Sequence, residues 1–125
     1  MAEVRKEYFQ YIIDFESVSA NERRQQALQI SADADFIVVE VSRTRTGSFK
    51  IRVLDTGSGL EWTNDFVDDD NFFGSAYDQG NRRPYRLPVP KRLKKNTTIA
   101  VTVWDTSGAS NTIQVAFIGY KEYQS

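Results

Sequence analysis

The sequence predicts an all-β protein: an antiparallel β-sandwich or a jelly-roll-like barrel, with a long irregular loop and an extended proline-containing arm. Three observations predict this class. Apolar residues recur at every second position in several segments, turn residues separate these segments, and no stretch has the 3.6-residue period of a long amphipathic helix. Short strands with turns between them are typical of sandwiches and barrels. The 125 residues are expected to form one domain, residues 1–125.

The first two predicted strands differ in regularity. EYFQYIIDF, residues 7–15, places four apolar side chains on one face, which are Phe9, Tyr11, Ile13 and Phe15. Gln10 and Asp14 point the other way, so a half-buried strand is predicted. RQQALQIS, residues 24–31, has the weaker alternation of Gln26, Leu28 and Ile30. A single helical turn that includes residues 20–24 is the alternative there.

Two predicted hairpins follow. DFIVVEVS (35–42) alternates Ile37, Val39 and Val41 against Val38, Glu40 and Ser42, and SFKIRVLD (48–55) alternates Phe49, Ile51 and Val53 against Lys50 and Arg52. The glycine-bearing stretch RTRTGS joins them, which favours a hairpin. TTIAVTVWD (97–105) and TIQVAFIGYKEY (112–123) flank the turn TSGASN in the same way. Their apolar rows are Ile99, Val101 and Val103 on one strand and Ile113, Val115 and Phe117 on the other.

Residues 56–96 break the regular pattern and separate charge by sign. A loop of this length is usually functional or contains short strands of its own. Its first part holds acids and no cation, namely Glu61, Asp65, Asp68, Asp69, Asp70 and Asp78. Its second part holds cations and no acid, namely Arg82, Arg83, Arg86, Lys91, Arg92, Lys94 and Lys95. Each block repels itself, so each is expected to meet charges of opposite sign.

The arm PYRLPVP, residues 84–90, contains all three prolines of the chain. Proline fixes φ and lacks an N–H, so this segment is predicted to be an edge strand or a surface arm and not a central strand. Tyr85, Leu87 and Val89 alternate with Arg86, which gives one apolar and one basic face. Two interpretations are open: the arm covers an edge of its own sheet, or it docks on a neighbouring chain.

The composition excludes several classes of function. The chain has no cysteine and no histidine, so disulfides, thiolate chemistry and Ser-His-Asp or Cys-His catalysis are absent. We therefore expect no enzyme, no cofactor and no metal site. A net charge of −1 argues against general attraction to nucleic acid, and no apolar run is long enough for a signal sequence or a membrane span. A cytoplasmic setting is expected.

Residues 56–96 raise the question of four further kinds of site. Asp65, Asp68–Asp70 and Asn71 offer oxygen ligands, but the ligand spacing of a calcium loop is missing, so a solvated acidic loop is favoured. A glycosidase needs two paired carboxylates, and no pair stands out. A carbohydrate-binding module would use exposed aromatic residues, of which the loop has Trp62, Phe72, Phe73 and Tyr77. A site for single-stranded nucleic acid is disfavoured, since Tyr85 alone could stack and acids lie beside it.

Several motifs resemble those of one family in content and order. They are ADADF (32–36), LDTGSGLEWTN (54–64), NFFG (71–74), PYRLPVPKRLKKNTTIAVTV (84–103) and VAFIGYKEY (115–123). Together they resemble the small capsid-associated proteins, also called auxiliary, cement or decoration proteins, of tailed bacteriophages. The resemblance implies a virion structural protein on the capsid surface, assembled in the host cytoplasm. Its partner would be the major capsid protein or another virion protein, and head–tail joining or fibre attachment are alternative roles.

Segregated charge and a stiff arm suit symmetric assembly, in which the basic strip of one subunit faces the acidic loop of another. A homo-oligomer is therefore expected, and a trimer is one form it could take. The predicted partner-binding residues are Arg82, Arg83, Tyr85, Arg86, Leu87, Val89, Lys91, Arg92, Lys94, Lys95, Glu61, Asp68, Asp69 and Asp70. No catalytic residue is predicted.

Overall fold

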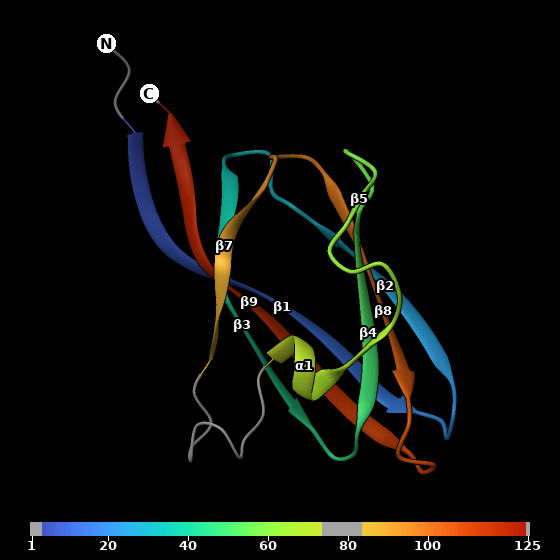
Figure 1. The fold of residues 1–125 in the computed structure, drawn as a ribbon. Coiled ribbons are helices and arrows are strands. Elements are labelled where there is room, and N and C mark those ends of the chain that lie inside the picture. The colour runs from blue at the N-terminus through green and yellow to red at the C-terminus, as the bar shows by residue number, and fades with distance from the viewer. Residues whose placement is uncertain (1–3, 74–83, 125) are drawn as a thin grey trace.

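The computed structural model describes residues 4–73 and 84–124 and shows two antiparallel sheets packed face to face (Figure 1). Sheet 1 has the strand order β1-β9-β3-β7, with bounds Val4–Val18, Asn111–Gln124, Asp35–Arg45 and Tyr85–Leu93. Sheet 2 has the order β2-β8-β4-β5, with bounds Arg23–Gln29, Thr98–Asp105, Phe49–Asp55 and Leu60–Glu61. The short β6 (Val67–Asp68) also pairs with β4, and the one-turn helix α1 (Asp69–Phe73) follows it. The predicted all-β sandwich is confirmed.

The core lies between the sheets and contains most of the predicted apolar rows. The row of β8 and the row of β9 are both buried in one cluster, although the two strands belong to different sheets. Phe15, Phe49 and Phe117 are fully buried there. Burying each large apolar side chain contributes about 1.5–3 kcal/mol. Residues 23–29 pair with β8 as the strand β2, and not as the alternative helical turn, and the fully buried Ile30 follows directly.

Both predicted hairpins are wrong. β3 pairs with β7 and β9, whereas β4 pairs with β8, β5 and β6. β8 and β9 likewise lie in different sheets. The turns after Arg45 and after Asp105 therefore carry the chain from one sheet to the other. The alternation of apolar residues shows only which face of a strand is buried. Two strands paired in a hairpin and two strands facing each other across the core both bury one face, so both give the same sequence pattern.

The phase of β3 also differs from the prediction. Phe36, Val38 and Val41 belong to the core cluster, while Val39 is only partly buried. The register shifts between Val38 and Glu40, so an irregularity at Val39 reverses the alternation half-way along the strand. Gly119 of β9 pairs with Val38 at this point, and a Cβ there would lie 1.8 Å from the carbonyl oxygen of Ile37. Only glycine fits so close to the backbone.

The segment predicted as one long irregular loop contains β5, β6, α1 and β7. β5 and β6 have two residues each, too few to produce a periodic pattern. β7 begins within the predicted arm and is the edge strand of sheet 1, as the prolines predicted. The arm thus covers the edge of its own sheet. Within the described residues, no helix is long and apolar enough to cross a membrane.

Candidate interface at the β7 edge

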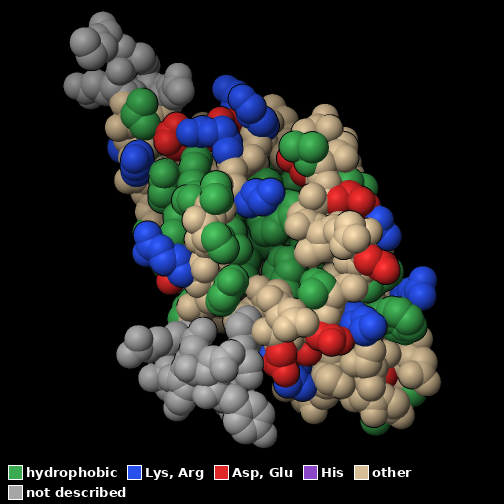
Figure 2. All heavy atoms as spheres, in the orientation of Figure 1, with side chains coloured by type: hydrophobic (Ala, Val, Ile, Leu, Met, Phe, Trp, Pro, Cys, Tyr) green, Lys and Arg blue, Asp and Glu red, His purple; other side chains and the backbone are tan. Residues whose placement is uncertain are grey.

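The side of the sandwich bordered by β7 contains an apolar groove. Sheet 1 ends there in β7, and sheet 2 ends in β5 and β6. Figure 2 shows hydrophobic side chains gathered between these segments, around a hollow in the surface. The hollow has a volume of about 300 Å³ and is bordered by Leu87, Pro88, Val89 and Lys91 on one side and by Trp62 and Phe72 on the other. We call it the β7 groove.

The β7 wall of the groove exists because β7 leaves the hydrogen-bonded ladder. Lys91 pairs with Val38 and Arg86 pairs with Glu40, so the four residues Leu87–Pro90 stand opposite the single residue Val39. Pro88 and Pro90 have no N–H to donate to β3, which favours this break. Leu87 remains packed against the core, but Val89 is 71% exposed at the rim.

An aromatic stack forms the opposite wall. Trp62 stacks on Phe72 with ring centroids 6.2 Å apart and meets Phe117 edge to face at 5.6 Å. Its backbone N–H donates to the carbonyl of Val53, which ties the segment after β5 to sheet 2. The ammonium of Lys91 lies 5.7 Å from the Trp62 ring centre, across the groove from its own strand. A cation over an aromatic face is attracted by the ring quadrupole, so Lys91 bridges the two walls.

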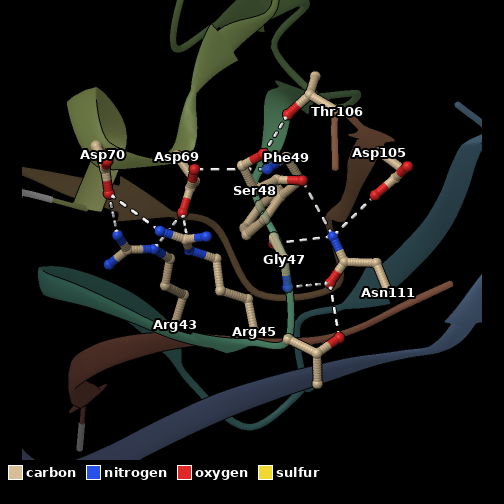
Figure 3. Close-up of polar contacts among 11 residues, drawn as sticks. Arg43, Arg45, Gly47, Ser48, Phe49, Asp69, Asp70, Asp105, Thr106 and Asn111 are labelled. Atoms are coloured by element: carbon tan, nitrogen blue, oxygen red, sulfur yellow. Dashed lines mark hydrogen bonds and ion pairs between the residues drawn. The ribbon is translucent and has the colours of Figure 1, made fainter. Parts of the chain in front are cut away.

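Buried charges hold α1, and with it Phe72, in place (Figure 3). The Nε atoms of Arg43 and Arg45 both lie 2.6 Å from Oδ2 of Asp69, whose side chain is almost fully buried. Asp70 also pairs with both arginines. Burying a carboxylate is costly unless it is paired and hydrogen-bonded, and here two guanidinium groups supply that compensation. The pairs fix α1 against the end of β3 and so place Phe72 behind Trp62.

A second polar cluster fixes the turn that follows these arginines (Figure 3). The side-chain N–H groups of the fully buried Asn111 donate to the carbonyls of Gly47 and Ser48 and to the Asp105 carboxylate. Burial opposes the ionisation of Asp105, but hydrogen bonds from Ser107, the Asn21 N–H and Asn111 outweigh it and hold the pKa of Asp105 far below its usual value. The cluster therefore holds together the two turns, after Arg45 and after Asp105, in which the chain passes from one sheet to the other.

The predicted basic residues fall into two groups. In the part of the chain that the structure describes, Arg86, Lys91, Lys94 and Lys95 are exposed and form no ion pair. Arg92 instead pairs with Asp35 and Glu122, each at 3.0 Å. The hydrogen bond to Glu122 raises the pKa of Arg92, and burial of the adjacent Leu93 anchors this end of β7. Arg82 and Arg83 lie outside the described residues, as do Tyr77 and Asp78.

Three of the four predicted acidic residues have partners within their own chain. Glu61 pairs with Arg52, and Asp69 and Asp70 pair with Arg43 and Arg45. The expectation of a solvated acidic loop is therefore wrong for Asp69, although Asp68 is exposed. Sequence reasoning missed these arginines because they belong to β3 and β4 and approach the acids only in the folded chain. Pairing of the acidic block with a neighbouring subunit stays a prediction.

The structure also bears on the other sites that the loop could form. Phe73 is buried and Phe72 is 9% exposed, so neither offers the open ring that a sugar-binding platform uses, while Trp62 is half-buried in the groove. Among residues 4–73 and 84–124, no three acidic side chains gather where they could hold a metal ion. The oxygens of Asp69 face Arg43, Arg45 and the N–H of Phe49.

Comparisons with known proteins give only distant likenesses. No family model matches the sequence, and no curated protein matches it. Among solved structures, the capsid of the Helicobacter pylori bacteriophage KHP30 is similar to this chain at 13% identity and a TM-score of 0.46, over 100% of this chain and 98% of that one. The Drosophila NLP core is similar at 9% identity and a TM-score of 0.40, over 95% and 98%.

A third similar structure is the dimeric latent PorU of Porphyromonas gingivalis, at 10% identity and a TM-score of 0.38. That likeness covers 93% of this chain but only 13% of PorU. At these identities and TM-scores, none of the three likenesses carries a function or a partner over to this chain.

Proposed function

We propose that this chain is a structural protein of a tailed-phage virion, a decoration or cement protein that attaches to the head through the β7 groove. Two independent features support the proposal. The order of motifs from ADADF to VAFIGYKEY resembles the capsid-associated family, and the longest of these motifs spans β7 and β8. The observation that carries the proposal is the groove itself, an apolar hollow bordered by Lys91, a cation that has no ion pair in the described chain.

The groove suggests the chemistry of its partner. An apolar side chain of a virion protein would fill the hollow against Trp62 and Val89, which contributes about 1.5–3 kcal/mol for each large side chain buried. A carboxylate beside it would face Lys91. Charges at the rim of an interface mainly raise the association rate and select the partner. The major capsid protein fits this role, and a head–tail or fibre attachment protein is the alternative within the virion.

The lining of the groove favours binding over catalysis. Its polar side chains are Thr63, Asn71 and Lys91, and the chain has no histidine or cysteine to act as a base or nucleophile. Lys91 lies against an aromatic ring, which suits contact with a partner. We therefore propose a non-enzymatic role that needs no cofactor.

The test is co-sedimentation with phage heads assembled without the protein. Wild-type protein should pellet with the heads, and Val89→Glu should weaken this binding at least tenfold because it places a charge in the apolar contact. Leu60→Glu is the matched control, since Leu60 is 65% exposed on β5 but is not part of the groove. Equal binding of Val89→Glu and wild type would exclude the groove as the contact. Binding to a glycan array but not to heads would instead show a carbohydrate-binding module.

A further inference from the structure

The first half of β1 is at the edge of sheet 1, with β9 on one side and no described strand on the other. All residues from Val4 to Gln10 are exposed, and Figure 1 shows this half projecting with the end of β9 beyond the rest of the sandwich. Several of the exposed large apolar side chains of the molecule lie here, namely Val4, Tyr8, Phe9 and Ile12. The segment contains no proline and no glycine, and its register with β9 is unbroken from Val4 to Phe15.

The backbone of this half presents unused hydrogen-bonding groups. The carbonyl of Asp14 accepts from Nε2 of Gln26 on β2, so Asp14 directs its backbone groups away from β9 and toward the outer edge. Backbone direction alternates along an antiparallel strand, so the even-numbered residues from Val4 to Ile12 also direct their N–H and C=O groups outward. Within residues 4–73 and 84–124, these outward groups have no backbone partner.

The charged side chains of this half do not guard the edge. Natural edges are often protected by lysines, prolines or bulges that prevent another strand from pairing. Here the ammonium of Lys6 lies over the ring of Tyr120 at 5.1 Å, and the guanidinium of Arg5 lies over Tyr123 at 4.5 Å. Arg5 also pairs with Glu7 at 3.2 Å. These contacts hold the charges against the strand's own sheet and leave the edge open.

We propose that the occupant of this edge is a second copy of the chain. The two β1 strands would pair antiparallel through Val4–Ile12, around a two-fold axis at Tyr8, and join the two copies of sheet 1 into one continuous sheet. The contact is isologous, so it closes at two copies. It lies at the opposite edge of sheet 1 from β7 and does not depend on the function proposed for the groove.

The avoidance of like charges directly opposite each other selects the axis at Tyr8. In that register Val4 faces the second copy's Ile12, Lys6 faces the second copy's Gln10, and no like charges oppose each other. An axis at Lys6 or at Glu7 would place two like charges directly opposite. An axis at Phe9 or Gln10 would extend the pairing to Asp14, whose carbonyl is already bonded to Gln26. Tyr8 is therefore the centre that uses the whole open edge without either conflict.

Sedimentation velocity over a range of concentrations tests the pairing. Wild-type protein should reach twice the 14.3 kDa mass of the chain. Tyr8→Glu should remain monomeric at the same concentrations, because it brings two carboxylates together at the axis. Val89→Glu, at the other edge of the same sheet, should dimerise like wild type. A wild-type protein that stays monomeric would overturn the proposal. So would a β1 edge that pairs with a strand of another virion protein and not with a second copy.

Cysteine cross-linking tests the register and does not depend on the charge variant. Residues opposite each other in a hydrogen-bonded antiparallel pair have Cα atoms about 5.5 Å apart, within the range of a disulfide. The chain has no cysteine of its own, so Tyr8→Cys should form a cross-linked dimer under mild oxidation. Gln10→Cys should not, because the two copies of position 10 would lie four residues apart, about 13 Å. Equal cross-linking of both variants, or of neither, would contradict this register.

Discussion

The two edges of sheet 1 differ in what they present to a partner. β7 carries the prolines, departs from the ladder over Leu87–Pro90, and turns apolar side chains and Lys91 toward a groove. β1 is regular over Val4–Ile12 and leaves its outward backbone groups open. One edge is protected against strand pairing and shaped for side-chain contacts, and the other is suited to backbone pairing. The difference teaches that one sheet can present two kinds of edge, and our proposals assign attachment to β7 and self-pairing to β1.

The largest expected effect on stability comes from a substitution in β9, which lies between β1 and β3 in sheet 1. Gly119→Ala should lower the free energy of unfolding by about 3 kcal/mol, because its Cβ would clash with the backbone of Ile37 and disturb β3, which supports β7. Chemical denaturation measures this loss. Gly59→Ala is the control, since Gly59 has a φ of +75° but open space around it, and should cost only about 1–2 kcal/mol. Equal losses of stability in the two variants would show that the close approach of the Ile37 backbone to Gly119 does not require glycine.

A second substitution should damage one edge and spare the other. Asp69→Asn removes the buried carboxylate between Arg43 and Arg45, so stability should fall by about 3 kcal/mol and binding to heads should weaken as α1 and Phe72 lose their anchor. Dimer mass should not change. Asp68→Asn, at an exposed neighbour, should alter stability by less than about 0.5 kcal/mol. If Asp69→Asn changes the dimer but not head binding, the two edges are not separate.

A third prediction concerns the pH dependence of the stability of the whole fold, on which both edges depend. The pKa of Asp105 is lowered in the folded protein, so its contribution to stability is present above the ordinary aspartate pKa of about 3.9 and is lost as pH falls toward the lowered value. Asp105→Asn should cost about 1–3 kcal/mol at pH 7 and flatten the loss of stability below pH 4. Thermal melts from pH 7 to pH 2 measure both. An unchanged acid profile in the variant would contradict the assignment to Asp105.

The smallest expected effect is electrostatic. Attachment to heads should weaken between 0.1 M and 1 M salt, as the screening length falls from about 10 Å to about 3 Å. Replacing Lys94 and Lys95 by Glu should weaken attachment at low salt, and replacing both by Gln should have an intermediate effect, since exposed pairs contribute about 1 kcal/mol or less each. Arg92 is unsuitable for this test because it already pairs with Asp35 and Glu122. Attachment that changes neither with salt concentration nor with these lysine substitutions would mean that the contact is purely apolar.

The sequence revealed single strands better than their partners. Period-two rows located the buried faces of β1, β4, β8 and β9, and the prolines placed β7 at an edge. Pairing could not be predicted, because strands that face each other across a core bury the same faces as strands of a hairpin. The shift at Val39 was hidden for a similar reason: Ile37, Val38 and Val39 are all apolar, so either phase satisfies the pattern.

Only part of the candidate interface was predicted, because its other residues come from segments that are distant in the sequence. The pattern placed Leu87 and Val89 on a surface arm, but the groove also needs Trp62 from the segment after β5 and Phe72 from α1, which only the fold brings close. The charge blocks were visible, but Arg43, Arg45 and Arg52 were not recognised as partners of the acids. Long-range ion pairs leave no local pattern in a sequence, whereas the burial of an alternating strand does.

The separation of the two edges is tested most directly by co-sedimentation with phage heads, using Tyr8→Glu and Val89→Glu side by side at the concentration at which wild type half-saturates the heads. Tyr8→Glu should pellet with the heads although it is a monomer in solution. Val89→Glu should stay in the supernatant although it is a dimer. Loss of attachment by Tyr8→Glu with retention by Val89→Glu would contradict the assignment of attachment to β7 and of self-pairing to β1.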